Sequence, residues 1–266
     1  MPRLKRSDAE RQLVESSGPE FLEALARGLR VIEAFGRDRR QLTLSDAARA
    51  VDLPRASVRR TLNTLVQLGY AATDGRLFRL TPRILTLAGS YLLSNPISEI
   101  LQPTVEKISA EVKEACSCAV LDGDDVVMIA HASPNRLVAV SAQIGFRIPA
   151  VASSLGRVML AALDDRALDK FFGRIKPSKL TPATVTDKSE LRKAIRKARA
   201  DGHSLVDQEV EVGFRSIAVP LRRLDGTVIA ALNIGAHSER SSLATMHKTF
   251  LPKLTETASR LQPQLI

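Results

Sequence analysis

The sequence predicts an α+β protein of two domains, an N-terminal winged helix-turn-helix domain and a larger mixed α/β domain, joined by a linker helix. Three observations support this prediction. Apolar residues recur at helical spacing before residue 69, a hairpin pattern follows directly, and strand-like apolar runs begin after residue 115. The length of 266 residues also agrees with two domains of about 100–200 residues each.

The composition is that of a folded protein with a basic surface. Hydrophobic residues make up 44% and charged residues 26%, which excludes wholesale disorder. Lys and Arg total 39 against 29 Asp and Glu, so the net charge of +10 favours a polyanionic partner or anionic ligands. No run of about 18 apolar residues occurs, and the first residues lack the apolar core of a signal peptide. We therefore expect a cytoplasmic protein without a membrane partner.

Helices dominate the first part of the chain. Residues 1–20 mix charges with Ser, Gly and Pro and are expected to be a flexible arm, and residues 21–82 form the first predicted domain. Its first helix runs from Phe21 to about Gly36, and Thr43 is the expected N-cap of a short second helix. Pro54 starts the third helix, which stops at Gly69.

A two-stranded hairpin completes the first domain. Tyr70–Ala72 and Leu77–Leu80 flank an Asp74-Gly75 turn, so they are predicted to form the wing. Residues 83–96 are the predicted linker, and the apolar helix over residues 84–93 needs a partner surface.

The second domain, residues 97–266, alternates helices and strands. Strands are predicted over residues 117–121, 126–130, 138–142, 216–221 and 228–234. Helices are predicted around residues 105–112, 155–163, 167–172, 190–200 and 242–261.

Residues 44–62 have the spacing of a helix-turn-helix. Small Ala48 lets the two helices approach, Asp52 lies at the turn, and Val58 and Leu62 join a shared core. Arginines on the outward side of the third helix can contact base edges or phosphates, and those of the hairpin the flanking backbone. A merely solvated basic face is the alternative, disfavoured because the helix spacing, helix start and hairpin agree. The predicted DNA contacts are Thr43, Ser45, Arg55, Ser57, Arg59, Arg60, Thr64, Arg76 and Arg79.

From about Phe21 onward the chain resembles the IclR-type transcriptional regulators. Four segments carry the likeness: residues 25–32 (LARGLRVI), 56–62 (ASVRRTL), 149–161 (PAVASSLGRVMLA) and 212–220 (VGFRSIAVP). Within the family, the segments IPA at 148–150, SSLG at 153–156 and LVDQE at 205–209 resemble the regulators of protocatechuate and 4-hydroxybenzoate catabolism, the β-ketoadipate pathway group.

The resemblance implies a fold, a set of partners and a mode of action. It implies a ligand-binding domain with a curved antiparallel sheet, assembled as a homodimer or a dimer of dimers on double-stranded promoter DNA. It further implies a small carboxylate effector, an aromatic acid or a β-ketoadipate-like acid, and RNA polymerase as a partner if the protein is an activator. The family contains both activators and repressors.

The resemblance also implies where the effector binds. Carried over from the family, the pocket residues are Ser153, Ser154, Asp207, Glu209, Ser216, Asn233 and Gly235. For a carboxylate ligand we also expect helix N-terminal amides near Ser154 and a cation, Arg147 or Arg215. Asn233 can instead pair with neighbouring backbone, and His131 can be a structural hydrogen-bonding residue rather than a pocket residue.

The sequence also leaves open two other functional classes, a thiol-based protein and an architectural DNA-binding protein. Cys116 and Cys118, expected to be reduced thiols, could serve a redox-sensing regulator or, with His131, a cysteine-dependent enzyme. The chain has no glycine-rich phosphate loop, no Gly-x-Ser-x-Gly elbow and no second ligand cluster for zinc, so we predict no enzyme, cofactor or metal. A purely architectural DNA-binding protein would not need the long second domain.

Overall fold

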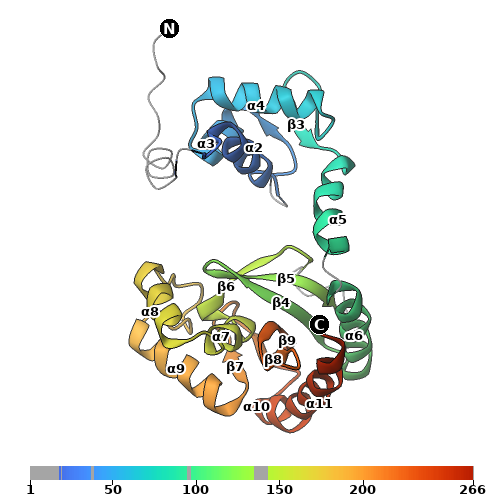
Figure 1. Ribbon diagram of the computed structural model, residues 1–266, viewed down its shortest axis with the longest axis vertical. Helices are drawn as coiled ribbons and strands as arrows, with labels where there is room; N and C mark the ends of the chain where they lie inside the picture. Colours follow the sequence, from blue (N-terminus) through green and yellow to red (C-terminus); the bar gives the residue numbers. More distant parts are fainter. Residues whose placement is uncertain (1–17, 19, 37–38, 95–96, 135–142, 266) are drawn as a thin grey trace. The chain divides into compact units, whose positions relative to one another are not determined.

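A computed structural model describes residues 18, 20–36, 39–94, 97–134 and 143–265 (Figure 1). The chain divides into two compact units, Met1–Ser94 and Asn95–Ile266, and each is described by itself. The predicted strand over residues 138–142 and nearly all of the predicted arm lie outside the described residues.

The first unit is a winged helix-turn-helix, as predicted. In its described part, three helices before residue 70 accompany a three-stranded antiparallel sheet of order β1-β3-β2, in which a short strand between the first and second of these helices joins the hairpin after the third. The elements are α2 (Glu23–Glu33), β1 (Leu42–Thr43), α3 (Leu44–Val51), α4 (Arg55–Gln67), β2 (Ala71–Thr73), β3 (Leu77–Leu80), the 3-10 turn η1 (Pro82–Ile84) and α5 (Leu85–Ser94).

Local sequence signals set the angle between α3 and α4. The Thr43 hydroxyl accepts a hydrogen bond from the backbone N–H of Asp46 at 3.2 Å, which caps α3. Asp52 ends that helix in the left-handed conformation, at φ 49°, and the N–H of Leu53 closes the turn onto the carbonyl of Ala48. Ala47 and Ala48 are buried at the crossing, so the two helices pack closely.

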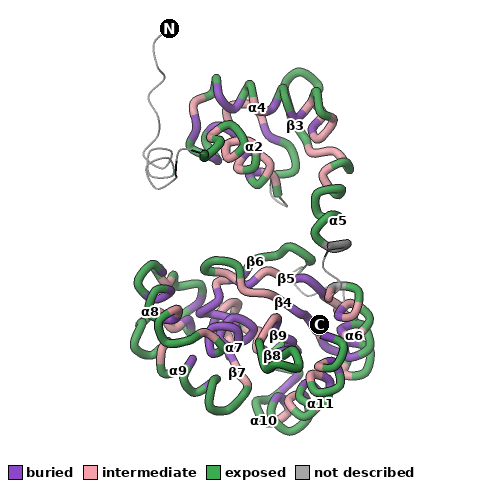
Figure 2. Tube along the Cα trace, in the orientation of Figure 1, coloured by how far each residue is buried: buried purple, intermediate pink, exposed green. Residues whose placement is uncertain are grey.

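The first helix differs from its prediction. It is shorter, and Leu22, Leu25 and Leu29 of its expected apolar face remain 70%, 60% and 48% exposed. Only Val31 within α2 is fully buried against the core of the unit, because α3 and α4 cover one side of this helix alone. The helix α5 is likewise exposed along most of its described length (Figure 2).

The second unit is built on a curved six-stranded antiparallel sheet of order β6-β5-β4-β9-β8-β7 (Figure 1). The two short edge strands, β6 and β7, were not predicted from the sequence. The strands are β4 (Ala115–Asp122), β5 (Asp125–Ala132), β6 (Arg147–Pro149), β7 (Ser204–Asp207), β8 (Phe214–Arg222) and β9 (Val228–His237).

Helices cover both faces of this sheet, and strand alternation sorts the residues between them. Cys116, Cys118 and Ile217 face α6 and α11, whereas Ala119 and Ala218 face α7 and the helices behind it. The helical elements are α6 (Ile97–Val112), η2 (Ala150–Ala152), α7 (Ser154–Ala161), α8 (Asp165–Arg174), α9 (Lys188–Asp201), α10 (Leu243–Thr245), the π-helical turn η3 (Met246–Phe250), α11 (Leu251–Leu261) and η4 (Gln262–Gln264).

Candidate nucleic-acid interface and ligand pocket

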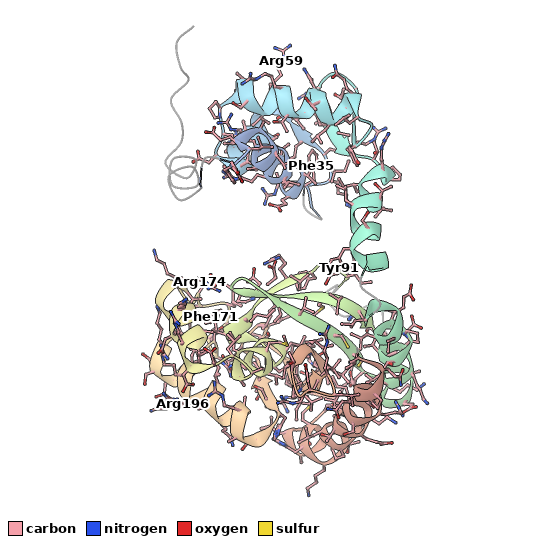
Figure 3. All side chains as sticks on the ribbon, in the orientation of Figure 1. Phe35, Arg59, Tyr91, Phe171, Arg174 and Arg196 are labelled. Carbon is pink, nitrogen blue, oxygen red and sulfur yellow. The ribbon has the colours of Figure 1, made fainter. Side chains whose placement is uncertain are left out.

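The outward face of α4 is a row of exposed arginines. Arg55, Arg59 and Arg60 are exposed, and none of the three forms an ion pair within the described part of the chain. Figure 3 shows Arg59 pointing away from the core of the first unit. Guanidinium groups held free on a helix that fits the major groove are suited to bidentate contact with guanine.

The wing presents two more arginines beside a rigid turn. The Asp74 carboxylate accepts hydrogen bonds from the N–H groups of Arg76 and Leu77 at 2.8 and 2.7 Å, and these bonds lower the pKa of Asp74. Gly75, at φ 96°, provides the left-handed residue of the turn. Arg76 and Arg79 are both exposed, and the hairpin therefore holds two cations near its tip.

The four predicted DNA contacts that are not arginines are less exposed than the arginines or already bonded within the unit. Ser57 is only 8% exposed and faces α2, so the prediction that it lies on the outward face is wrong. Its small side chain allows the start of α4 to pack near α2. The Thr43 hydroxyl is engaged with Asp46 in the helix cap, and Ser45 is half-buried. Thr64 is exposed, but its hydroxyl donates back to the carbonyl of Arg60 at 2.9 Å.

Polar residues gather on the α7 side of the large sheet. Ser117 lies opposite Asn233 in the β4–β9 ladder, and Ser216 lies opposite Gly235 in the β8–β9 ladder. By strand alternation these four residues share the face that carries Ala119 and Ala218. Ser117, Ser216 and Asn233 are each less than 9% exposed, so the fold buries three polar side chains in an otherwise apolar layer.

The start of α7 meets this polar face. Ser153 caps the helix by accepting from the N–H of Gly156 at 3.0 Å, and the Ser154 and Ser216 hydroxyls are 2.7 Å apart. The positive end of the α7 dipole therefore lies beside two buried hydroxyls, an arrangement that favours an anion.

Asn233 supplies the clearest sign of a ligand. Its Oδ1 is buried and has no hydrogen-bond partner among the described residues. A buried polar atom without a partner costs free energy, about 1–3 kcal/mol, unless a ligand or water satisfies it. For Oδ1, the predicted alternative, pairing of Asn233 with neighbouring backbone, is not found among the described residues.

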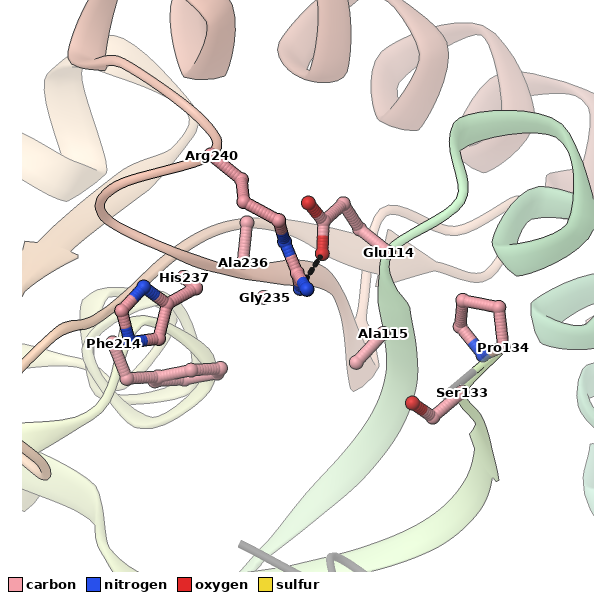
Figure 4. Close-up of a pocket in the computed structure, with 9 residues that line it drawn as sticks. All are labelled: Glu114, Ala115, Ser133, Pro134, Phe214, Gly235, Ala236, His237 and Arg240. Atoms are coloured by element: carbon pink, nitrogen blue, oxygen red, sulfur yellow. Dashed lines mark hydrogen bonds and ion pairs between the residues drawn. The ribbon is translucent and has the colours of Figure 1, made fainter. Parts of the chain in front are cut away.

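A narrow pocket of about 10 Å³, enough for about one water molecule, opens at the end of the same strands (Figure 4). Gly235 and Phe214 line it together with Ala115, and the ion pair between Arg240 and Glu114 crosses it at 3.0 Å. A side chain on Gly235 would overlap the Phe214 ring. Gly235 therefore has the role of letting this ring lie over the strand.

Two predicted pocket residues lie elsewhere. Arg147 is on the exposed edge strand β6, where its guanidinium binds Asp122 at 2.6 Å and Asp125 at 3.1 Å. Asp207 lies opposite Arg215 on the other face of the sheet, and the Nε of that arginine donates to it at 3.0 Å. Alternation places both Asp207 and the alternative cation Arg215 away from Ser216. These two residues, and Arg147 at the exposed edge, therefore lie apart from the polar face that carries Ser216.

Glu209 is buried in a structural ion pair. Its carboxylate accepts from Arg157 at 2.8 Å and from the N–H of Val185 at 3.0 Å. Arg157 also donates to the carbonyl of Val151, and both charged side chains are less than 9% exposed. The pair joins α7 to the segment after β7, and so it positions the helix rather than offering a free carboxylate to a ligand.

The two cysteines give no support to the thiol-based alternatives. Cys116 and Cys118 are fully buried on the sheet face that packs against α6 and α11. Burial raises the pKa of both thiols, so the reactive thiolate is scarce at neutral pH. Within the described ranges no group of three His, Cys, Asp or Glu residues is arranged to hold a metal, and no helix is long and apolar enough to span a bilayer.

Both units match family models of known proteins. Residues 89–262 match the family model described as the bacterial transcriptional regulator IclR C-terminal, and residues 24–75 match the IclR helix-turn-helix domain. The chain is 42% identical to the Pca regulon regulatory protein of Pseudomonas putida, over 99% of this chain and 91% of the relative. It is 33% identical to the p-hydroxybenzoate hydroxylase transcriptional activator of Acinetobacter baylyi, over 91% of this chain and 92% of that relative. An IclR homolog from Microbacterium hydrocarbonoxydans, crystallised with 4-hydroxybenzoate, is 29% identical over 91% of this chain and 98% of that one, with a TM-score of 0.75.

Proposed function

Because the chain belongs to the IclR family of bacterial transcriptional regulators, we propose that it binds promoter DNA through α4 and the wing and responds to a hydroxylated aromatic acid bound on the α7 side of the large sheet. It is a regulator of the type that controls aromatic catabolism, not an enzyme. The proposal of a bound ligand rests on one observation, the unpartnered Oδ1 of Asn233 beside the Ser154–Ser216 pair. Promoter binding places its action in the cytoplasm.

For DNA recognition we propose Arg55, Arg59 and Arg60 as the α4 contacts, and Arg76 and Arg79 as contacts of the wing with the phosphate backbone. Thr43, Ser45 and Thr64 remain candidates for phosphate contacts at the helix ends. The exposure of the five arginines and the net charge of +10 support this division.

Replacing Arg59 should remove sequence recognition. We expect Arg59→Ala to weaken binding to an operator fragment about tenfold or more, because one bidentate base contact is worth about 1–3 kcal/mol. Fluorescence anisotropy on operator and scrambled DNA measures the change. Arg76→Ala should instead weaken both DNAs alike and lower the salt dependence by about one phosphate contact.

The matched control is Arg196→Ala, which removes an exposed arginine from α9 in the other unit (Figure 3). It should leave operator binding unchanged. Equal losses on operator and scrambled DNA for Arg59→Ala would show that Arg59 contacts only phosphates.

For the effector we propose a carboxylate at the start of α7, beside Ser153, Ser154 and Ser216, with Asn233 and Gly235 forming the sheet side of the pocket. The charge of the carboxylate would be stabilised by the helix dipole and two hydroxyls. The 4-hydroxybenzoate in the Microbacterium homolog and the names of the Pseudomonas and Acinetobacter relatives support an aromatic acid.

The effector class is tested by thermal unfolding with protocatechuate, 4-hydroxybenzoate and β-ketoadipate. A ligand at 100 times its dissociation constant adds about 2.7 kcal/mol to the stability of the folded state, and the midpoint should rise by several degrees. The same compound should change operator occupancy in footprinting. A panel that alters neither the midpoint nor the footprint would contradict the effector assignment and leave DNA binding standing.

We further propose that the protein works as a homodimer, with a dimer of dimers as the larger form. Within the first unit, Leu25, Leu29, Leu68 and Leu87 line an open apolar groove between α2, α4 and α5. Large exposed apolar surface is typical of an interface, and a second copy would cover the part of the groove formed by these leucines, leaving Arg60, which lines the same groove, open to DNA. An effector that binds one arrangement of the dimer better than another would change the spacing of the two α4 helices, and in an activator this change would reach RNA polymerase.

A further inference from the structure

A second polar cluster lies on the pocket face, across the strands from the start of α7. The Ser117 hydroxyl, on β4, is 2.9 Å from Nδ1 of His131 on β5. On its other side Ser117 lies opposite Asn233 of β9. Side chains directly opposite in an antiparallel ladder have Cβ atoms about 5 Å apart, so His131, Ser117 and Asn233 form one polar row. Ser117 was not among the predicted effector residues, and for His131 the sequence left open whether it is a pocket residue or a structural hydrogen-bonding residue.

The His131 ring is held in place and is neutral. The side-chain amide of Gln102, on α6, donates to the carbonyl of His131 and accepts from its N–H, both at 3.1 Å. These two bonds fix the backbone that carries the ring. Burial lowers the pKa of His131, so at neutral pH the ring carries one N–H donor and one acceptor nitrogen. Its Nε2 has no hydrogen-bond partner among the described residues.

The unpartnered atoms of this row call for a group that both donates and accepts hydrogen bonds. Oδ1 of Asn233 is an acceptor and needs a donor. A carboxylate is an acceptor only, and a neutral imidazole does not balance its charge. A hydroxyl group donates to Oδ1 and accepts from an N–H or from the Ser117 hydroxyl.

From this chemistry we propose that Ser117, His131 and Asn233 bind the ring hydroxyl of a hydroxylated aromatic acid and set its preference over unsubstituted benzoate. The inference rests on the proposed function, because it takes the effector carboxylate to lie at Ser154 and Ser216. Strand β8, which carries Ser216, and strand β4, which carries Ser117, are two strand spacings apart in the sheet, and the ladder registers offset the two residues by two positions along the strands. At about 4.8 Å for each strand spacing and about 3.4 Å for each residue along the strand, the diagonal is about 12 Å. One benzene ring with a carboxylate and a para hydroxyl, plus a hydrogen bond at each end, spans such a distance.

Calorimetric titration of the full chain with 4-hydroxybenzoate, protocatechuate, benzoate and β-ketoadipate tests the proposal. The wild type should prefer 4-hydroxybenzoate to benzoate by about tenfold or more, because the analogue without the hydroxyl leaves the buried Oδ1 of Asn233 unpaired. In Ser117→Ala and His131→Leu the preference should fall below about threefold, through weaker binding of 4-hydroxybenzoate and not through tighter binding of benzoate.

Two further variants separate a direct contact from a general loss of structure. His131→Gln should keep part of the preference, because its amide can reach the position of the ring Nε2. Thr257→Val removes a buried hydroxyl from α11, in the helical layer on the opposite side of the sheet, and should keep the whole preference. Unfolding midpoints check that each variant is folded.

The outcomes distinguish this inference from the proposed function. If Ser117→Ala and His131→Leu are folded and keep the tenfold preference, the hydroxyl site is wrong and the effector assignment stands. If the wild type binds β-ketoadipate and neither hydroxylated aromatic acid, the hydroxyl site is also wrong, although a carboxylate effector remains. If none of the four compounds binds, the effector assignment itself fails.

Discussion

Arg157→Met is expected to destabilise the second unit by about 3–5 kcal/mol, because it leaves the Glu209 carboxylate buried without its counter-charge. For a domain of this size the unfolding midpoint should fall by about 10 °C or more. The Arg157 side chain also loses its hydrogen bond to the carbonyl of Val151, which ties α7 to the turn before it. Thermal and denaturant unfolding of the full chain measure the loss.

The double variant gives the sharper result. Arg157→Met with Glu209→Gln removes both charges, and the new amide can still accept from the N–H of Val185. It should be more stable than Arg157→Met alone, although it carries one more substitution, because the cost of the unpaired charge disappears. Losses that simply add would show that the two charges act independently.

An exposed ion pair provides the control. Lys193 and Glu190 are 2.9 Å apart on the surface of α9, with side chains 68% and 58% exposed. Lys193→Met should leave the unfolding midpoint nearly unchanged, since solvent screens such pairs. Arg157→Met and Lys193→Met each remove one cation from an ion pair. A large loss of stability in the first and not in the second would identify burial of the remaining carboxylate as the cause of the loss.

Local signals predicted the first unit well. The Thr43 cap, the Asp52 turn and the Asp74-Gly75 hairpin each depend on a few neighbouring residues, and each is present in the structure. The burial of Ser57 was missed because position 57 lies at the border of the apolar face of α4, and only the approach of α2 decides the side on which it falls.

The residues of the pocket could not all be predicted from short stretches of sequence, because strand phase and contacts between distant residues decide which side chains meet. The phase of β7 places Asp207 away from Ser216, and Gln208, at φ 60°, ends the strand so that Glu209 turns toward α7. The partner of Glu209 is 52 residues away in sequence, so no spacing rule reveals it. A signal for the missed Ser117 was present, since it is a polar residue between Cys116 and Cys118 in an apolar strand.

Gly156→Ala is the substitution for which the structure offers least room. A Cβ at Gly156 would lie closer than 3.0 Å to the carbonyl oxygen, Cα and carbonyl carbon of Ala150. These are backbone atoms of η2, so no side-chain rotation relieves the overlap, and either η2 or α7 must move. Overpacking of a core typically costs about 1–3 kcal/mol, and we expect Gly156→Ala to reach or exceed the upper figure because every residue of α7 is buried.

A glycine with free space around it should show the opposite change in stability when it is replaced by alanine. Gly173 lies in α8, is exposed, and has no atom within 4 Å of the position of a new Cβ. Gly173→Ala should therefore stabilise the protein by about 0.4–1 kcal/mol, since alanine restricts the unfolded chain and favours the helix. Unfolding midpoints of both variants decide the matter: a Gly156→Ala protein as stable as the wild type would mean that η2 and α7 separate without cost. Because the start of α7 carries Ser153 and Ser154, any variant that shifts this helix should also weaken binding of the carboxylate.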